Sequence, residues 1–249
     1  YAVHTPIQAR PEIVDRYRSK PSTDGHANPT YAAMIESLDR GVGRILAALE
    51  ERGLSENTVV IFASDNGGFG PVTSMAPLRG SKGMLYEGGI RTPMVVRWPK
   101  QVEAGSTSAT PVIGLDLYPT LVNLAGARIP DDHPIDGVNL TSTLTGSGEI
   151  PERDLIWHFP AYLEADRSVA GMWRTTPASA LRRGPHKLIH FFENDRWELY
   201  DLKSDASEMN DLSEKHPELM LSLSSSLKHW WEDVDAFLPS RPNPFYRDE

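Results

Sequence analysis

The sequence predicts an α/β fold with a small α+β domain attached at its C-terminal end. Three observations support this prediction: a long amphipathic helix pattern, two short apolar runs rich in β-branched residues, and a later change to strands in close succession. A helix, strand, loop, strand and helix in succession are typical of an α/β sheet. The later strands, joined by short turns, are typical of an antiparallel sheet.

The N-terminal segment predicts a loop followed by one long helix. The first 28 residues are polar and interrupted by proline, so we expect an extended loop around His4-Thr5-Pro6. Asn28 suits a helix N-cap, a proline follows it, and Gly53 stands where a left-handed C-terminal residue belongs. Apolar residues at three- and four-residue steps predict a core-facing stripe on this helix. They are Ile35, Leu38, Val42, Ile45, Leu46 and Leu49.

Two continuous apolar runs, Thr58–Ala63 and Met94–Trp98, predict strands. Such runs are typical of strands buried on both faces of a parallel sheet that helices cover. Leu115–Ala125 then predicts a helix, which Gly126 ends.

The composition shifts toward Thr, Ser and Gly between Leu140 and Pro151, which we interpret as a linker. We therefore expect a larger α/β domain over residues 1–145 and a small α+β domain with a tail over 146–249. Antiparallel strands are predicted at 155–159, 180–183, 187–192 and 197–202, followed by a helix over 217–231.

Composition excludes several classes of function. The 249 residues carry a net charge of −9, with no run of Lys or Arg, which argues against a nucleic-acid partner. No stretch approaches the roughly 18 apolar residues of a membrane span. Cysteine is absent, so disulfides, Cys-ligated zinc, iron–sulfur clusters and thiol nucleophiles are excluded within this sequence.

The segment Ser64–Gly68, directly after the first predicted strand, is the sharpest candidate site. In open α/β sheets, ligands bind beyond the carboxyl ends of the strands. Asp65 and Asn66 offer a carboxylate and an amide oxygen, which are hard donors suited to calcium or magnesium. Taken alone, the same residues are also typical of an ordinary turn after a strand.

Two further segments offer chemistry. Glycines between Leu78 and Pro93 allow a close backbone approach, and Lys82 among them suits a tetrahedral oxyanion such as sulfate or phosphate, although a lone lysine is often only solvated. His4 is open to roles as a general acid, a metal ligand or a surface residue. The patterns of nucleotide loops, zinc helices and α/β-hydrolase nucleophiles are all absent.

Taken in order, these segments resemble the sulfatase family of the alkaline phosphatase superfamily. His4-Thr5-Pro6 is followed by VVIFASDNGG at Val59–Gly68 and by RGSKGMLYEGGIRTP at Arg79–Pro93. Trp157–Pro160 and Glu198–Leu202 are similar to the family's C-terminal sheet. The resemblance covers essentially the whole chain. It implies that residues 1–145 are the C-terminal portion of the catalytic domain and hold part of a doubly wound sheet.

The resemblance also implies roles for individual residues. Asp65 and Asn66 would be two ligands of a divalent cation, Ca²⁺ with Mg²⁺ as the alternative. Lys82 would hold the sulfate, and His4 would contact the sulfate and donate a proton to the leaving alcohol. Glu87 and Arg91 would form an internal ion pair that braces the glycine loop.

One departure from the family is decisive for the expected function. Sulfatases use a formylglycine made from the Cys or Ser of a C-x-P-S-R-type motif in their N-terminal half. This chain has no Cys, and its Pro239-Ser240-Arg241 has Phe237 at the nucleophile position. The chain therefore resembles the C-terminal half of a sulfuric ester hydrolase, whose partner would be the N-terminal half of the same protein.

The expected substrate is a sulfated small molecule or carbohydrate. Two alternatives stay open: a phosphoester or phosphonate monoester hydrolase of the same superfamily, and a non-catalytic binding remnant of the fold. The sequence leaves the compartment undetermined, and only the resemblance favours the periplasm or secretion.

Overall fold

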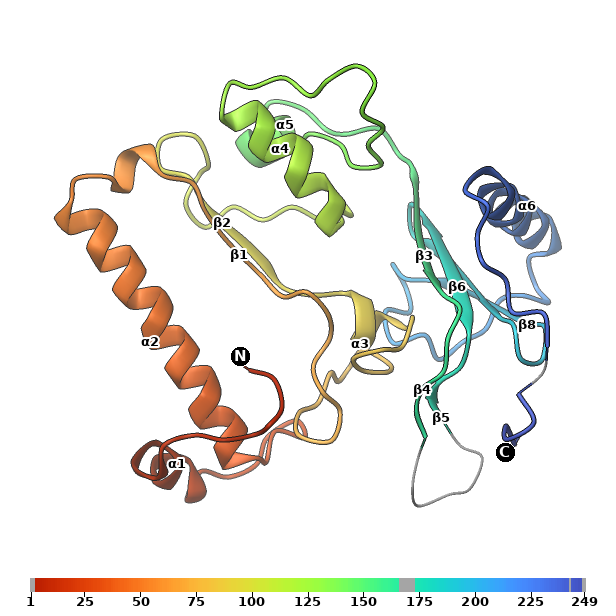
Figure 1. Ribbon diagram of the computed structural model, residues 1–249, viewed down its shortest axis with the longest axis horizontal. Helices are drawn as coiled ribbons and strands as arrows, with labels where there is room; N and C mark the ends of the chain where they lie inside the picture. The colour runs from red at the N-terminus through yellow and green to blue at the C-terminus, as the bar shows by residue number, and fades with distance from the viewer. Residues whose placement is uncertain (1–2, 166–172, 242, 248–249) are drawn as a thin grey trace. The chain divides into compact units, whose positions relative to one another are not determined.

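The computed structural model describes residues 3–165, 173–241 and 243–247 (Figure 1). The chain divides into two compact units, residues 1–65 with 93–151 and residues 66–92 with 152–249. Residues 66–92 thus belong with the C-terminal unit, whereas the sequence predicts a boundary at 145/146. That domain division stays a prediction, and the two compact units are described separately below.

The long predicted helix is confirmed as α2 (Pro29–Glu51). The Asn28 side chain accepts a hydrogen bond from the Tyr31 amide at 3.0 Å, which caps the helix as predicted. At the other end Gly53 has a φ of 67°, and the Leu54 amide donates to the Leu49 carbonyl at 2.8 Å. This left-handed residue ends the helix where glycine carries no steric penalty.

A second helix precedes it, α1 (Pro11–Arg18), so the predicted extended loop is wrong for this stretch. Proline at its first position, Glu12 in the first turn and arginines in the last turn all favour a helix. Ile13 and Val14 are buried against Ala33 of α2. With so few apolar positions, the helix depends on this tertiary contact.

The two predicted strands exist as β1 (Val60–Ala63) and β2 (Met94–Arg97), but they pair antiparallel. The prediction of a parallel arrangement is wrong for this pair, because a continuous apolar run indicates burial and not the direction of its partner. Nor are both faces buried in this chain, since Phe62 is 40% and Val95 62% exposed.

The remaining elements of the first unit are short helices, one of which carries the buried carboxylate of Asp116. They are η1 (Ser55–Asn57), η2 (Gly114–Asp116), α4 (Leu117–Leu124) and α5 (Thr141–Thr145). Asp116 accepts hydrogen bonds from the amides of Ile113 at 2.8 Å and Val138 at 2.9 Å. The amide of buried Leu140 donates to Thr120 Oγ1 at 2.9 Å. The predicted linker from Leu140 is therefore wrong at its start, which is an ordered part of this unit.

The predicted C-terminal sheet is confirmed as four antiparallel strands in the order β3-β6-β7-β8. Their bounds are Asp154–Phe159, Ala178–Arg183, His186–Phe191 and Arg196–Asp201. The predicted helix follows as α6 (Pro217–Asp233). A short pair that the sequence analysis missed, β4 (Leu163–Ala165) and β5 (Trp173–Thr175), and the single turn α3 (Glu87–Ile90) complete the unit. Helices and strands together agree with the predicted α/β class.

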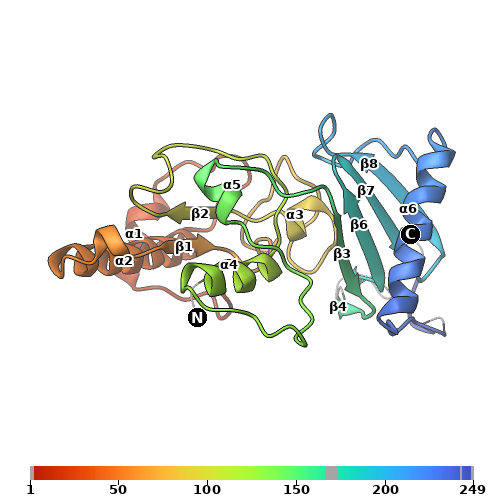
Figure 2. The ribbon, with the colours of Figure 1, turned by 90° about the horizontal axis from the view of Figure 1, so that it is seen from above.

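This sheet separates α6 from the segment 66–92 (Figure 2). One face packs on α6 through Leu181, Leu188, Leu199, Leu223, Leu227 and Trp231. The opposite face, with Ala180, Ile189 and Tyr200, packs on Leu85 and Tyr86 of the glycine-rich loop at residues 78–91. Successive strand residues point to opposite faces, so Lys187 and Glu198 share the face that meets this loop. Among the described residues, no helix is long and apolar enough to cross a membrane.

Candidate functional site

Residues Ser64–Gly68 leave the end of β1 and run directly onto the glycine loop, which we define as residues 78–91. The Ser64 amide donates to the Pro93 carbonyl at 3.2 Å, and the Gly67 amide donates to the Gly89 carbonyl at 2.8 Å. A Cβ atom on Gly67 would overlap the backbone of Gly88 and Gly89. The glycine that follows Asn66 is therefore required by a close backbone approach. Asp65 is exposed, and Asn66 is half-buried.

Lys82 lies beside this strand-end segment, in the middle of the glycine loop. Its amide donates to the Gly68 carbonyl at 2.9 Å, and its side chain is partly exposed. Gly80 and Gly83 flank it with φ values of 79° and 92°, which allow the chain to turn on either side of the lysine. The structure thus brings the backbone of Lys82 close to the segment that carries Asn66, and the expectation that their side chains share one site stays a prediction.

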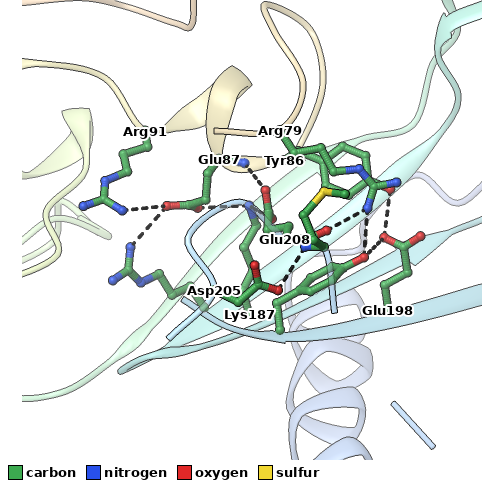
Figure 3. Close-up of polar contacts among 11 residues, drawn as sticks. Arg79, Tyr86, Glu87, Arg91, Lys187, Glu198, Asp205 and Glu208 are labelled. Carbon is green, nitrogen blue, oxygen red and sulfur yellow. Dashed lines mark hydrogen bonds and ion pairs between the residues drawn. The ribbon is translucent and has the colours of Figure 1, made fainter. Parts of the chain in front are cut away.

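Below the loop, a buried group of charges joins it to the C-terminal sheet (Figure 3). Lys187 Nζ lies 3.0 Å from Glu87 Oε1 and 2.8 Å from Glu208 Oε1. The Glu87 amide donates to Glu208 Oε2 at 2.6 Å. All three side chains are at most 2% exposed. Burial raises the pKa of Glu208, an effect that the charge of Lys187 opposes.

The predicted ion pair of Glu87 and Arg91 is confirmed, with 3.8 Å between Glu87 Oε2 and an Arg91 guanidinium nitrogen. Arg182 lies at a similar 3.9 Å from the same oxygen. Both separations are too long for direct hydrogen bonds, and this oxygen has no hydrogen-bond partner among the described residues. Burial lowers the pKa of Arg182, and the Glu87 charge opposes that effect. Lys187 is therefore the closest cationic partner of Glu87.

A second set of polar contacts holds the beginning of the loop. Arg79 donates to the Tyr200 hydroxyl and to the Glu208 carbonyl, each at 3.0 Å, and it stacks on the Tyr86 ring. The hydroxyls of Tyr86 and Tyr200 donate to the same Glu198 oxygen at 2.8 and 2.9 Å. Burial, with a further contribution from Tyr86, raises the pKa of Tyr200 to about 12, so both tyrosines act as neutral donors.

His4 lies in the first compact unit and is exposed. Its Nδ1 lies 3.2 Å from the carbonyl oxygen and 3.1 Å from Oγ1 of the neighbouring Thr5. These local contacts fit a histidine in a loop and assign it no chemical role. The expectation that His4 shares a site with Lys82 stays a prediction.

The donor set near β1 fits part of a metal site. Asp65 and Asn66 are adjacent residues at a strand end, and their oxygens are donors that hard cations prefer. Across the described ranges, no group of three or more His, Cys, Asp or Glu residues lies close enough to hold a metal ion. Since calcium takes about six to eight oxygen ligands, this pair supplies a minority of a coordination shell.

The sequence analysis missed Lys187 and Glu208. Each is separated from Glu87 by at least 100 positions, so no local pattern connects them. One signal was present, because a lysine opens the apolar run KLIHF on a predicted strand. A charge at a core-facing strand position requires a buried partner.

Comparisons with known proteins agree with this architecture. Residues 1–127 match the family model described as "Sulfatase", and residues 81–233 match the model "N-sulphoglucosamine sulphohydrolase, C-terminal". A "Sulfatase" from Formosa agariphila is 35% identical over 254 residues, which cover 92% of this chain and 44% of that protein.

Two solved structures extend the similarity to the fold. The crystal structure of Ps i-CgsB in complex with k-i-k-neocarrahexaose has a TM-score of 0.78 and 31% identity, covering 97% of this chain and 50% of that one. The structure of BT4656 in complex with its substrate D-glucosamine-2-N,6-O-disulfate has a TM-score of 0.66 and 30% identity. The match covers 82% of this chain and 40% of that one. The chain therefore spans about half the length, or less, of these relatives.

Proposed function

This chain belongs to the sulfatase family, and we propose that it forms the C-terminal half of a sulfuric ester hydrolase. The observation that carries the proposal is the 2.9 Å hydrogen bond from the Lys82 amide to the Gly68 carbonyl. It joins the segment of the expected metal ligand Asn66 to the loop of the expected sulfate ligand Lys82. In this proposal the chain contributes half of the metal and sulfate site, and the rest belongs to the N-terminal half.

Two groups that the chain lacks would complete the chemistry. A formylglycine in the N-terminal half would supply the nucleophile that attacks sulfur. A divalent cation, Ca²⁺ or Mg²⁺, would act as a Lewis acid on the sulfate oxygens, with Asp65 and Asn66 as two of its ligands.

The residues of this chain would act on charge and protons. The Lys82 ammonium would bind sulfate oxygens and stabilise the negative charge that develops on them in the transition state. His4, in its protonated form, would donate a proton to the bridging oxygen as the alcohol leaves. The two residues would therefore act on different atoms of the ester. Lys82 would act on the sulfate oxygens, and His4 would act on the bridging oxygen, which leaves with the alcohol when the S–O bond breaks.

For the substrate we propose a sulfated carbohydrate or other sulfated small molecule. Support comes from the solved relatives, of which one was crystallised with a neocarrahexaose and another with a disulfated glucosamine. Sulfate and phosphate are both tetrahedral oxyanions, so a lysine and a histidine do not by themselves separate the two esters.

The cation assignment gives a direct test on the complete protein. Hard cations depend on ligand charge, so Asp65→Ala should weaken metal affinity much more than Asn66→Ala. Metal would be titrated into chelated protein while the hydrolysis of a sulfate ester and of a matched phosphate ester is followed. We expect sulfate ester turnover that falls with Asp65→Ala and recovers at high metal concentration.

Three other outcomes would redirect the proposal. Phosphate ester turnover alone would favour a phosphoester hydrolase. Absence of both activities in metal-loaded protein would favour a non-catalytic remnant. Indifference of both variants to the metal concentration would make Ser64–Gly68 an ordinary turn.

A further inference from the structure

We propose that Lys187 and Glu208 are positioning residues for Lys82: their buried ion pair fixes the glycine loop on the C-terminal sheet. The proposal rests on the proposed function for the role of Lys82. It adds two residues that lie outside the segments expected to touch the substrate or the metal.

The loop is attached on both sides of Lys82, and both attachments involve Glu208. On the N-terminal side, Arg79 donates to the Glu208 carbonyl at 3.0 Å. On the C-terminal side, the Glu87 amide donates to the Glu208 carboxylate at 2.6 Å, and Lys187 lies 3.0 Å from the Glu87 carboxylate (Figure 3). Glu208 therefore contacts the glycine loop on both sides of Lys82.

Glu208 itself is held in an uncommon conformation. Its φ is 52°, in the left-handed region that few non-glycine residues adopt. Asp205 stabilises this turn by accepting hydrogen bonds from the amides of Met209 at 2.9 Å and Asn210 at 2.8 Å. Because the turn is fixed on both sides of Glu208, its carboxylate is presented to the loop in one direction.

The interior of the loop transmits this placement to Lys82. A Cβ on Gly88 would overlap the backbone of Arg79 and Gly80, and one on Gly89 would overlap that of Ser81 and Met84. The Gly88 amide also donates to the Arg79 carbonyl at 2.7 Å. With backbone packed against backbone, the loop has little room to change shape, so a shift of Glu87 displaces Lys82 as well.

Stability alone gives a weak reason for such a pair. Replacing a buried ion pair by apolar side chains of similar volume is often neutral or stabilising, whereas removing one partner is costly. Buried charged groups can instead be kept because they specify a single arrangement. A lysine catalyst needs that arrangement, because a displacement of about 1 Å can cost about 100-fold in rate.

The test uses the complete protein with the paired replacement Lys187→Met and Glu208→Leu. This change removes both charges of the pair and the acceptor of the Glu87 amide, and it leaves Arg91 and Arg182, at 3.8 and 3.9 Å, as the nearest cations of the Glu87 carboxylate. Circular dichroism therefore checks that the variant is folded before kcat is compared. We expect kcat for a sulfate ester to fall about 10- to 100-fold with a much smaller change in KM. The pair Lys187→Met and Glu208→Gln keeps an acceptor oxygen and should recover part of that loss.

The control is Asp154→Asn, which breaks the Arg183–Asp154 ion pair, at 2.6 Å, between β3 and β6. It should lower the melting temperature without the loss in kcat. Hydrogen exchange of the Lys82 and Gly88 amides gives a readout that does not need activity. Both amides should exchange faster in the Met/Leu variant than in the control.

Unchanged kcat in a folded Met/Leu variant would overturn the proposal, and so would exchange no faster than in the control. If the unaltered protein hydrolyses no sulfate ester, the proposed function fails, and the exchange of the Lys82 amide alone decides whether the pair positions the loop. Faster exchange then supports the proposal, and equal exchange overturns it.

Discussion

Lys82 is proposed to stabilise charge on the sulfate, and His4 to donate a proton to the leaving oxygen. Their variants should therefore respond differently to the leaving group. A lysine that holds the sulfate stabilises charge whichever alcohol departs, so Lys82→Ala should slow aryl and alkyl sulfates by similar factors. A proton donor matters most for a poor leaving group. His4→Ala should therefore cost about 100- to 10,000-fold on a sugar or alkyl sulfate and largely spare a nitrophenyl sulfate.

The measurement is kcat/KM of both variants on both esters, compared as losses of transition-state free energy. Equal losses on good and poor leaving groups would leave His4 as a sulfate-binding residue only.

At Gly67, the packing of Ser64–Gly68 against the glycine loop leaves no room for a side chain. Gly67→Ala would place a methyl group against the Gly88 and Gly89 backbones, which cannot move as a flexible side chain could. We expect a loss of about 1–3 kcal/mol in the free energy of unfolding, as overpacking typically costs. Urea denaturation would measure it.

The matched control is Gly43→Ala, in α2. A Cβ there meets nothing within 4 Å, so the change should be neutral or stabilise the helix by up to about 1 kcal/mol. Equal effects of the two substitutions would mean that the Gly67 contact is not as tight as the structure has it.

Local signals explain which elements the sequence predicts correctly. Helix α2 and the strands β6 to β8 were predicted because caps, apolar periodicity and turn residues all lie within a few positions of one another. Helix α5 was missed because Thr141–Thr145 has low helix propensity, and its stability comes from the packing of Leu140. The direction of the β1–β2 pair depends on partners, which a single run does not encode.

The residues of the candidate site also divide into those with a local sequence signal and those without one. Asp65, Asn66 and Lys82 belong to short motifs whose order could be recognised. The Lys187–Glu208 pair joins residues brought together by the fold, so it became visible only once β7 and the turn at Glu208 were in place. An ion pair between distant residues follows no sequence periodicity. The signal that the sequence offers is a charged residue at a position expected to be buried.

In β7, a buried histidine gives the C-terminal sheet a predicted pH dependence. Burial lowers the pKa of His190, while Asp195, 2.7 Å away, opposes the shift. The unfolded chain then binds a proton more readily than the folded one. His190 therefore stabilises the fold above its unfolded pKa of about 6.5, and this contribution is lost as the pH falls through the folded pKa.

We expect the free energy of unfolding to decline as the pH falls below about 6.5, and His190→Gln to reduce that decline. Urea denaturation between about pH 5 and 8 would show it. His229→Gln is the control, because the His229 side chain is 74% exposed. A decline that is identical in both variants would assign the effect to other groups.

Exposed apolar side chains on several elements of the first unit suggest that this unit is incomplete without a partner surface. Ile45 of α2 is 60% exposed, Val95 of β2 62%, and Leu121 of α4 49%. The α2 stripe was predicted to face a core, yet Ile35 and Ile45 are exposed in this chain. Under the proposed function, the N-terminal half would cover such positions. Large uncovered apolar patches promote association.

We therefore predict that the 249 residues alone self-associate and do not hydrolyse sulfate esters. Light scattering should show association that weakens when Ile45→Lys and Val95→Thr are combined, because both changes break up the exposed apolar surface. Leu221→Lys, at a 69% exposed position on α6 in the other unit, serves as the control and should have a smaller effect. With an aryl sulfate, the isolated chain should stay at the background rate, since it has no formylglycine precursor cysteine and supplies only two of the expected metal ligands. Turnover by this chain alone would place the nucleophile within it and contradict the proposed division of the site.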